Sequence, residues 1–134
     1  MLAIFAHSTV YMVETFERLF PTQGWALVNL SYNSKDPFAL SLVIGGPTSP
    51  LRWLFSRELL DEGMRSEAGR GDVRIAPTDD RRWINFELGG SSGTTLLRGQ
   101  MFVVTDFLYR THALVPAGEE CRWIDLDHEV AKLT

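Results

Sequence analysis

Apolar side chains recur at every second position through much of the first half of the chain. Between turn-forming residues at 21–24 and 33–35, Ala26, Val28 and Leu30 fall on one side of an extended chain. Successive side chains of a strand point to opposite faces, so this period predicts strands that bury one face. The pattern predicts four strands in this half, over residues 8–20, 26–32, 38–44 and 51–55.

The period changes after the fourth strand, where the sequence predicts a short helix over residues 57–63. Ser56 can cap this helix, Glu58 lies in its first turn, where the helix dipole favours an acid, and Gly63 can end it. Alternation then returns. It predicts three further strands, over residues 72–76, 82–88 and 94–99.

Two more helices are predicted towards the C-terminus. Residues 101–111 place apolar side chains at helical spacing, although Val103 and Val104 also suit a strand. Asp125 can cap a last helix, because acids follow it in the early turns as the helix dipole prefers. The inner face of that helix would carry Leu126, Val130 and Leu133.

Short connections between the predicted strands decide the fold class. A parallel crossover needs a dozen or more residues, so strands joined by short turns must pair antiparallel. The sequence therefore predicts an α+β fold with two antiparallel β-meanders, each followed by a helix. One domain spanning residues 1–134 accounts for the length of the chain.

The charge of the chain bears on its partners. It carries 13 Lys and Arg residues against 17 Asp and Glu residues, which gives a formal net charge of -4 at pH 7. Most of that charge lies in residues 119–134, which hold five acids and two bases. Non-specific binding to nucleic acid depends on an excess of basic surface that releases counterions. The composition therefore argues against a nucleic-acid partner, although a local basic patch stays open.

The sequence also bears on location. The single Cys121 excludes an intramolecular disulfide and a thiolate zinc cluster, which fits a reducing, cytoplasmic location. The longest apolar stretches, at residues 38–46 and 101–104, are far shorter than the roughly 20 residues that cross a bilayer. The N-terminus lacks the basic start of a secretory signal. We expect no direct insertion into a membrane.

No motif combines the residue types and the spacing of a catalytic, cofactor or metal site. Gly69 and Gly71 resemble part of a phosphate loop, but the third glycine is missing and a strand follows where a helix should begin. The three histidines fall in different predicted elements, and no Gly-x-Ser-x-Gly elbow is present. We therefore expect a protein that is not an enzyme and needs no cofactor.

The most suggestive polar group lies on two neighbouring elements. Arg57 and Glu58 begin the first predicted helix. Asp72 and Arg74 lie at the strand that follows it. Opposite charges on adjoining elements can form a buried or interfacial ion-pair network that specifies geometry more than it adds stability. The alternative is a set of solvated salt bridges of little energetic consequence.

Several blocks of this sequence share their order and spacing with one protein family. They run from residue 32 towards the C-terminus and so cover most of the chain. The blocks are Tyr32 with Asp36-Pro37-Phe38-Ala39, Trp53-x-Phe55-x-Arg57-Glu58-Leu59-Leu60-x-x-Gly63, Gly69-x-Gly71-Asp72-Val73-Arg74-Ile75-x-Pro77, Leu96-Leu97, Phe107-Leu108-x-Arg110-Thr111, Val115-Pro116-x-Gly118 and Asp125-Leu126-Asp127-x-Glu129. In these blocks the chain resembles the SsgA-like proteins, a small sporulation and cell-division family of actinomycetes.

The resemblance implies a non-enzymatic protein of sporulation-specific septation, whose family members help to localise or activate the tubulin-like GTPase FtsZ at future septa. It also implies a fold similar to the whirly-like single-stranded nucleic-acid-binding proteins, assembled as a homo-oligomer, a trimer. FtsZ or another division protein would be the partner, in the cytoplasm at division septa. The motif residues implied to be structural or to contact a partner are Tyr32, Asp36, Pro37, Trp53, Arg57, Glu58, Gly63, Gly71, Asp72, Arg74 and Pro77.

A second function stays open, because a shared fold does not by itself establish function. Arg81, Arg82 and Trp83 could offer charge and stacking to a single strand of nucleic acid, together with a nearby arginine. That arginine is Arg74, on a neighbouring strand. Acids beside this group leave only a small local surplus of positive charge, so we rank nucleic-acid binding below protein binding.

The tryptophans give a further hypothesis about interfaces. Large aromatic rings dominate the energetics of protein interfaces. An exposed ring at Trp25, Trp83 or Trp123 could therefore anchor either a second subunit or a partner. The alternative is that all three rings belong to the core.

Overall fold

The computed structural model describes residues 7–45, 50–91 and 93–124. Strands and helices alternate in the order that the sequence predicts. The elements are β1 (Thr9–Phe20), β2 (Gly24–Asn33), β3 (Ala39–Ile44), β4 (Leu51–Ser56), α1 (Arg57–Gly63), β5 (Val73–Pro77), β6 (Trp83–Leu88), β7 (Thr95–Gln100) and α2 (Met101–Leu114). A further helical turn begins at residue 120.

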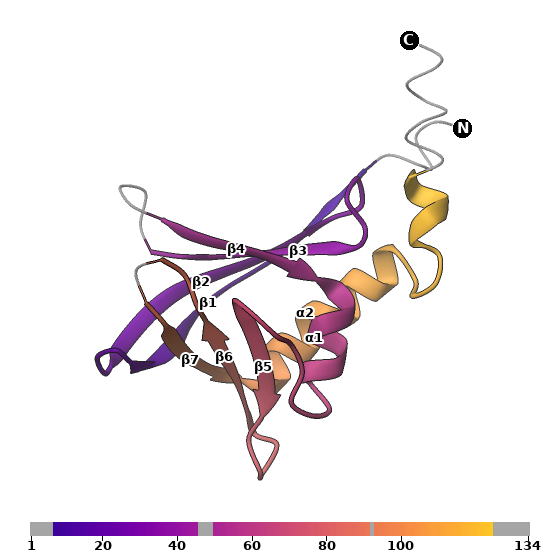
Figure 1. The fold of residues 1–134 in the computed structure, drawn as a ribbon. Helices are drawn as coiled ribbons and strands as arrows, with labels where there is room; N and C mark the ends of the chain where they lie inside the picture. The colour runs from indigo at the N-terminus through magenta and orange to yellow at the C-terminus, as the bar shows by residue number, and fades with distance from the viewer. Residues whose placement is uncertain (1–6, 46–49, 92, 125–134) are drawn as a thin grey trace.

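All seven of these strands join one antiparallel sheet, in the order β4-β3-β2-β1-β7-β6-β5. The pairing of β1 with β7 connects the two meanders, with Glu17 opposite Arg98 (Figure 1). The two meanders and the helix after each are confirmed. Their union through β1 and β7 was not predicted, because periodicity reports local structure and this pairing joins segments about eighty residues apart.

The sheet curves into a half-barrel, and both helices lie against its inner side (Figure 1). Helix α2 packs against β1, β6 and β7, while α1 packs against β4 and β5. Val104 and Phe107 of α2 are fully buried, as are Val28 and Leu30 on the inner face of β2. One apolar core therefore lies between the sheet and the helices, and it takes alternate residues from each strand.

Trp53 joins the two meanders across the inner side of the half-barrel. Its indole Nε1, on β4, donates a hydrogen bond of 2.8 Å to the carbonyl oxygen of Gly89, just after β6. Four strands lie between β4 and β6 in the sheet, so the bond spans the curve of the barrel instead of following it. This motif residue therefore helps to fix how strongly the sheet curves.

Helix α1 begins and ends where the sequence predicts. The Oγ of Ser56 accepts a hydrogen bond of 3.0 Å from the backbone N–H of Leu59, and Glu58 lies in the first turn. At the other end, Gly63 packs so closely on β5 that a Cβ atom there would lie 2.5 Å from the Cβ of Ile75. The glycine is needed because α1 approaches β5 too closely for any side chain.

The burial of strand β1 departs from the predicted pattern at its end. Met12 and Phe16 are buried, but Phe20, which an unbroken alternation would place on the same face, is more than half exposed. The register of β1 against β7 shifts between Arg18 and Phe20, and such an irregularity turns the following side chain away from the core.

The predicted helix near the C-terminus forms and is longer than expected. Helix α2 continues to Leu114, and Val103 and Val104 both lie inside it, so the strand alternative for this segment is wrong. The helix predicted from Asp125 lies outside the residues that the structure describes.

The substitution Gly63→Ala should destabilise the protein, although alanine favours a helix. The added methyl would overlap the side chain of Ile75, and overpacking of this kind costs about 1–3 kcal/mol, against about 1 kcal/mol gained in helix propensity. We expect a lower urea midpoint with an unchanged m value. Gly90→Ala is the control, because a Cβ at Gly90 meets no atom within 4 Å. Equal midpoints for the two variants would contradict the close approach of α1 and β5.

Candidate functional site

Arg57 is buried at the start of helix α1, with 2% of its surface exposed. Its Nη1 donates hydrogen bonds to the carbonyl oxygens of Thr111 at 3.1 Å and Val115 at 2.7 Å, at the end of α2. The last carbonyls of a helix form the negative end of its dipole, so they attract the guanidinium. A buried charge is costly unless it is paired, and these carbonyls supply part of the compensation.

Glu120 supplies the counter-charge. Its Oε2 lies 3.4 Å from the Nη2 of Arg57, an ion pair whose geometry falls short of a hydrogen bond. The side chain of Glu120 is largely enclosed. Burial raises the pKa of this carboxyl, but the backbone amides of Glu120 and Gly118 and the charge of Arg57 together outweigh it, so the pKa lies below its ordinary value.

Tyr32 completes this group from strand β2. The Cζ of Arg57 lies 4.9 Å from the centre of the Tyr32 ring, within the range of a cation–π contact. The Tyr32 hydroxyl donates a hydrogen bond of 2.9 Å to the carbonyl oxygen of Pro37. Burial raises the pKa of Tyr32 to about 12 against the opposing charge of Arg57, so the phenol stays a neutral donor. We call Tyr32, Arg57 and Glu120 the arginine cluster.

The structure contradicts the ion-pair network predicted between helix α1 and strand β5. Arg57 turns inward to Glu120. Arg74 pairs instead with Glu67 at 2.9 Å and Glu87 at 3.3 Å, in exposed bridges of the kind that contribute little stability. The reason is the alternation along β5: Val73 and Ile75 are buried, so Arg74 between them points to the opposite side of the sheet. The two remaining members of the predicted network, Glu58 and Asp72, are exposed.

The other motif residues shape the backbone. Asp36 is exposed and Pro37 is buried in the turn after β2, and Pro77 ends β5. Gly71 has a φ of 83°, which side chains rarely adopt, so the turn before β5 requires a glycine. The carbonyl oxygen of Asp72 accepts a hydrogen bond of 2.7 Å from the loop after β6. These residues position strands and turns. Pro37 also accepts the hydrogen bond of the Tyr32 hydroxyl, and the charge of Asp36 acts on the same phenol.

The outer side of the first meander exposes a group of large apolar side chains. They come from the strand positions that alternate with the core, and each is more than half exposed. Val13 lies diagonally across from Leu27, because Val13 faces Asn29 and Thr15 faces Leu27. Two serines, Ser31 and Ser41, lie between Tyr11 and Leu54 across the strands. Exposed apolar side chains that gather on one face of a domain mark interaction sites. We call this group the outer apolar face: Tyr11, Val13, Trp25, Leu27 and Leu54.

Polar atoms on the same side of the sheet lack partners. Asn29 Oδ1, Asn85 Oδ1 and Arg98 Nε are buried and form no hydrogen bond with the described residues. All three residues alternate with core positions on their strands, so they belong to the outer side. Buried polar groups are normally hydrogen-bonded. This side of the sheet is therefore suited to contact with groups from outside the chain.

The three tryptophans proposed as anchors have different surroundings. Trp25 belongs to the outer apolar face and is strongly exposed. Trp123 packs partly against the core, and its ring centre lies 6.2 Å from that of His7. Trp83 is partly buried at the start of β6. Of the three, Trp25 has the exposure that an interface anchor needs, and the hypothesis stays a prediction.

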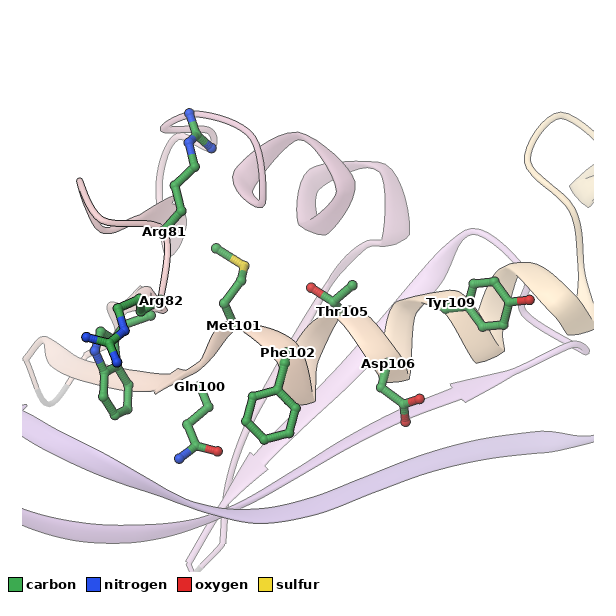
Figure 2. A pocket seen from close by; sticks show the side chains of 9 residues that line it. Arg81, Arg82, Gln100, Met101, Phe102, Thr105, Asp106 and Tyr109 are labelled. Carbon is green, nitrogen blue, oxygen red and sulfur yellow. The ribbon is translucent and has the colours of Figure 1, made fainter.

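A second surface feature is a hollow of about 920 Å³ beside helix α2 (Figure 2). Arg81 and Arg82, in the turn before β6, lie at one end of it, and Tyr109 lies at the other. One side of α2 runs between them. We call this hollow the α2 groove, which is lined by Arg81, Arg82, Trp83, Gln100, Met101, Phe102, Thr105, Asp106 and Tyr109.

The described residues contain neither a candidate metal centre nor a membrane-spanning helix. Within residues 7–45, 50–91 and 93–124, no group of three or more His, Cys, Asp or Glu side chains could hold a metal ion. His112 instead pairs with Asp61, with 2.8 Å between Nε2 and Oδ2, and so links α2 to α1. In the same part of the chain, none of the helices has the length and apolar character to cross a bilayer.

A mostly antiparallel half-barrel with helices on its inner side defines a class of α+β proteins, and solved structures share it. The chain matches the crystal structure of an SsgA-like sporulation-specific cell division protein from Thermobifida fusca with a TM-score of 0.80, at 33% identity over 96% of both chains. It matches a structure from a study of SsgB mutations and longitudinal cell division during sporulation of Streptomyces coelicolor with a TM-score of 0.79. That match has 29% identity and covers 87% of this chain and 96% of the other.

Sequence comparison gives the same relationship. The family model described as Streptomyces sporulation and cell division protein, SsgA, matches residues 27–120. The chain is 39% identical over 109 residues to the sporulation-specific cell division protein SsgB of Thermobifida fusca, across 79% of each chain. It is 35% identical over 107 residues to SsgB of Streptomyces coelicolor, across 78% of each. The chain belongs to the SsgA family, as its sequence blocks predicted.

Glu120, the counter-charge of Arg57, was not predicted from the sequence. A signal was present, because Pro116 follows the end of α2 and turns the chain just before two consecutive acids. Only one of them meets the arginine, since Glu119 pairs with Arg122 at 2.7 Å. The choice between neighbouring acids depends on the shape of the turn, which the sequence does not give.

The substitution Glu120→Gln should weaken the dependence of the free energy of unfolding on pH in the acid range. The folded-state pKa of Glu120 lies below its ordinary value of 4.5, so its charge stabilises the fold above that pH. This contribution is lost as the pH falls through the folded-state pKa. The variant should be less stable at neutral pH. The two free energies of unfolding, measured by urea titration at each pH, should converge as the pH falls below 4.5 and through the folded-state pKa.

Glu62→Gln is the control for this measurement, because Glu62 is exposed and its side chain has no ion pair among the described residues. Its profile should run parallel to that of the unsubstituted protein. An offset between the Glu120→Gln and unsubstituted profiles that stays constant as the pH falls below 4.5 would show that the charge of Glu120 does not stabilise the folded state.

Proposed function

We propose that this chain is a non-enzymatic, sporulation-specific cell-division protein that helps to localise or activate FtsZ at septum sites through protein–protein contacts. It acts as a homotrimer in the cytoplasm at division septa, as one whirly-like domain spanning residues 1–134, and it uses no cofactor. FtsZ or another division protein is the partner. The division role is supported by the relatives, which are sporulation-specific cell division proteins.

The observation that carries the proposal is the outer apolar face. Removing apolar surface from water is favourable by about 25 cal/mol per Å², and the interfaces of homo-oligomers are more apolar than other protein surfaces. A second copy that covered this face would bury side chains such as Trp25 and Leu27, which now lie exposed. It would also bring groups close to the unpartnered Oδ1 of Asn29. Both features support self-association through the outer side of the sheet.

Self-association suits a partner that is itself a polymer. A trimer presents three copies of every other binding surface, and linked sites raise the overall affinity far above that of one site. Weak contacts at each subunit then suffice to hold the protein on assembled FtsZ, while single FtsZ molecules are bound weakly. This physical argument connects the apolar face to placement at a septum.

The substitution Leu27→Asp should lower the mass of the assembly. A carboxylate within the outer apolar face would be buried without a partner at the interface, which is strongly unfavourable. Light scattering after size-exclusion chromatography should give a trimer for the unsubstituted protein and a smaller species for the variant. Ser66→Asp, at an exposed loop position away from this face, should stay trimeric. A trimeric Leu27→Asp variant would move the interface elsewhere, and a monomeric unsubstituted protein would contradict the homotrimer.

Co-sedimentation with GTP-assembled FtsZ from the same organism tests the partner. The protein should pellet saturably, only in the presence of polymer, and at both a low and a high salt concentration, because apolar contacts are not screened by salt. The control is FtsZ kept unassembled with GDP. Absence of the protein from the pellet at every concentration would contradict direct contact with FtsZ.

Single-stranded nucleic-acid binding is the alternative function, and one observation favours it. Arg81, Arg82 and Trp83 line the same groove, so positive charge and an aromatic ring lie together as a stacking platform requires. Anisotropy of a fluorescent oligo(dT) separates the two functions. Saturable binding that weakens steeply with salt would favour the alternative, whereas the proposed function predicts no saturable binding.

A further inference from the structure

The α2 groove has an apolar wall with two separate anchor points. Phe102 and Tyr109 are both more than two thirds exposed, and they lie seven residues apart on α2. That spacing places them on one side of the helix, about 10 Å apart along its axis. Met101 and Trp83 line the groove near its arginine end. The wall therefore has the length of about two helical turns, enough for a short peptide segment.

The turn that carries the two arginines has a fixed shape. Asp80 Oδ1 accepts hydrogen bonds from the Oγ1 of Thr78 at 2.7 Å and from the backbone N–H of Arg82 at 3.0 Å. Arg81 has a φ of 58°, a left-handed conformation that is uncommon outside glycine. The carbonyl oxygen of Arg82 accepts from the N–H of Met101, which ties the turn to α2. Strained residues that are held in this way cluster at functional sites.

Two arginine side chains at one end of the groove keep hydrogen-bond donors available, although the charge of Arg82 also acts on the neighbouring Asp80. The guanidinium of Arg82 forms no hydrogen bond or ion pair with the residues that the structure describes. Arg81 uses its Nη1 for the carbonyl oxygen of Arg65, at 3.0 Å, which leaves its other donors available. Asp106 is the one carboxylate among the lining residues, and it pairs with Arg110 at 3.1 Å. Donors suited to a carboxylate ligand therefore remain at one end of the groove.

We propose that the α2 groove binds a short segment of a partner protein in which carboxylates lie beside large apolar side chains. The apolar side chains pack along the wall between Phe102 and Tyr109, and the carboxylates meet Arg81 and Arg82. The proposal rests on the function proposed above only in taking the partner to be a division protein. It adds the chemistry of the segment that the partner presents and the surface that receives it.

Charge complementarity selects this occupant. A strand of nucleic acid needs a longer basic track, and here the two arginines share the groove with Asp106. A second copy of the chain would instead cover the outer apolar face, whose defining residues include no arginine. An amphipathic acidic segment contacts both parts of the groove at once, the apolar wall and the arginine end. If it docks as a helix, its apolar side chains recur at the spacing that such a groove accepts.

Selection from a random dodecapeptide library on phage tests the proposal without assuming a partner. The full-length protein is immobilised as bait, and the enriched peptides should carry several acids beside large apolar residues. A fluorescent synthetic copy of the best peptide should bind the double variant Arg81→Glu with Arg82→Glu at least about tenfold more weakly. Phe102→Ala should also weaken binding. Arg70→Glu, an equal change of charge at an exposed arginine outside the groove, should not.

Each other outcome overturns the proposal in a recognisable way. The peptide site is contradicted if no peptide is enriched, if the enriched peptides are neutral or basic, or if the groove variants bind with equal affinity. Cooperative melting of the variants, like that of the unsubstituted protein, shows that they are folded. Binding of oligo(dT) that is lost with Arg82→Glu assigns the groove to nucleic acid. A fall in assembly mass with Phe102→Ala assigns it to a second copy of the chain.

The co-sedimentation assay separates this proposal from the proposed function. If the unsubstituted protein and the groove variants pellet equally with FtsZ polymers, the groove is not the contact and the proposed function stands. If acidic peptides bind the groove but nothing pellets, the groove proposal stands and direct FtsZ contact fails.

Discussion

A single buried positive charge holds the helices of this protein in place. The side chain of Arg57 is almost fully enclosed, and an enclosed charge is tolerated only where partners surround it. Those partners come from the end of α2, through Thr111 and Val115, from the chain beyond it, through Glu120, and from β2, through Tyr32. The start of one helix, the end of the other and a central strand are therefore fixed by one side chain.

Because the core and the arginine cluster use the inner side of the half-barrel, other surfaces remain for binding. Strand β2 is apolar on both sides, with Val28 in the core and Leu27 exposed to solvent. Helix α2 shows the same division, since Phe107 is buried while Phe102 and Tyr109 lie outside. In the single chain, the apolar surface on one side of each element is covered by the core, and the apolar surface on the other side stays in water. The exposed sides are where contact with other molecules lowers the free energy most.

Local signals in the sequence were enough to predict the helices and strands, and to single out two members of the arginine cluster. Ser56 and Gly63 mark the ends of α1 through capping and close approach, which are properties of a few neighbouring residues. The sequence blocks also singled out Tyr32 and Arg57, which meet in the structure. The predicted pairing across α1 and β5 was wrong, because an ion pair depends on distances of a few ångströms. Glu120 was missed for the same reason.

The strands, the helices and their order could be predicted from the sequence, because periodicity, caps and turns are properties of adjacent residues. The sequence blocks also predicted the family. Three contacts became evident in the folded chain alone: β1 pairs with β7, Arg57 meets Glu120, and two arginines lie beside the exposed side of α2. These contacts join segments far apart in the chain, and the packing of the whole sheet on its helices sets the distances between them.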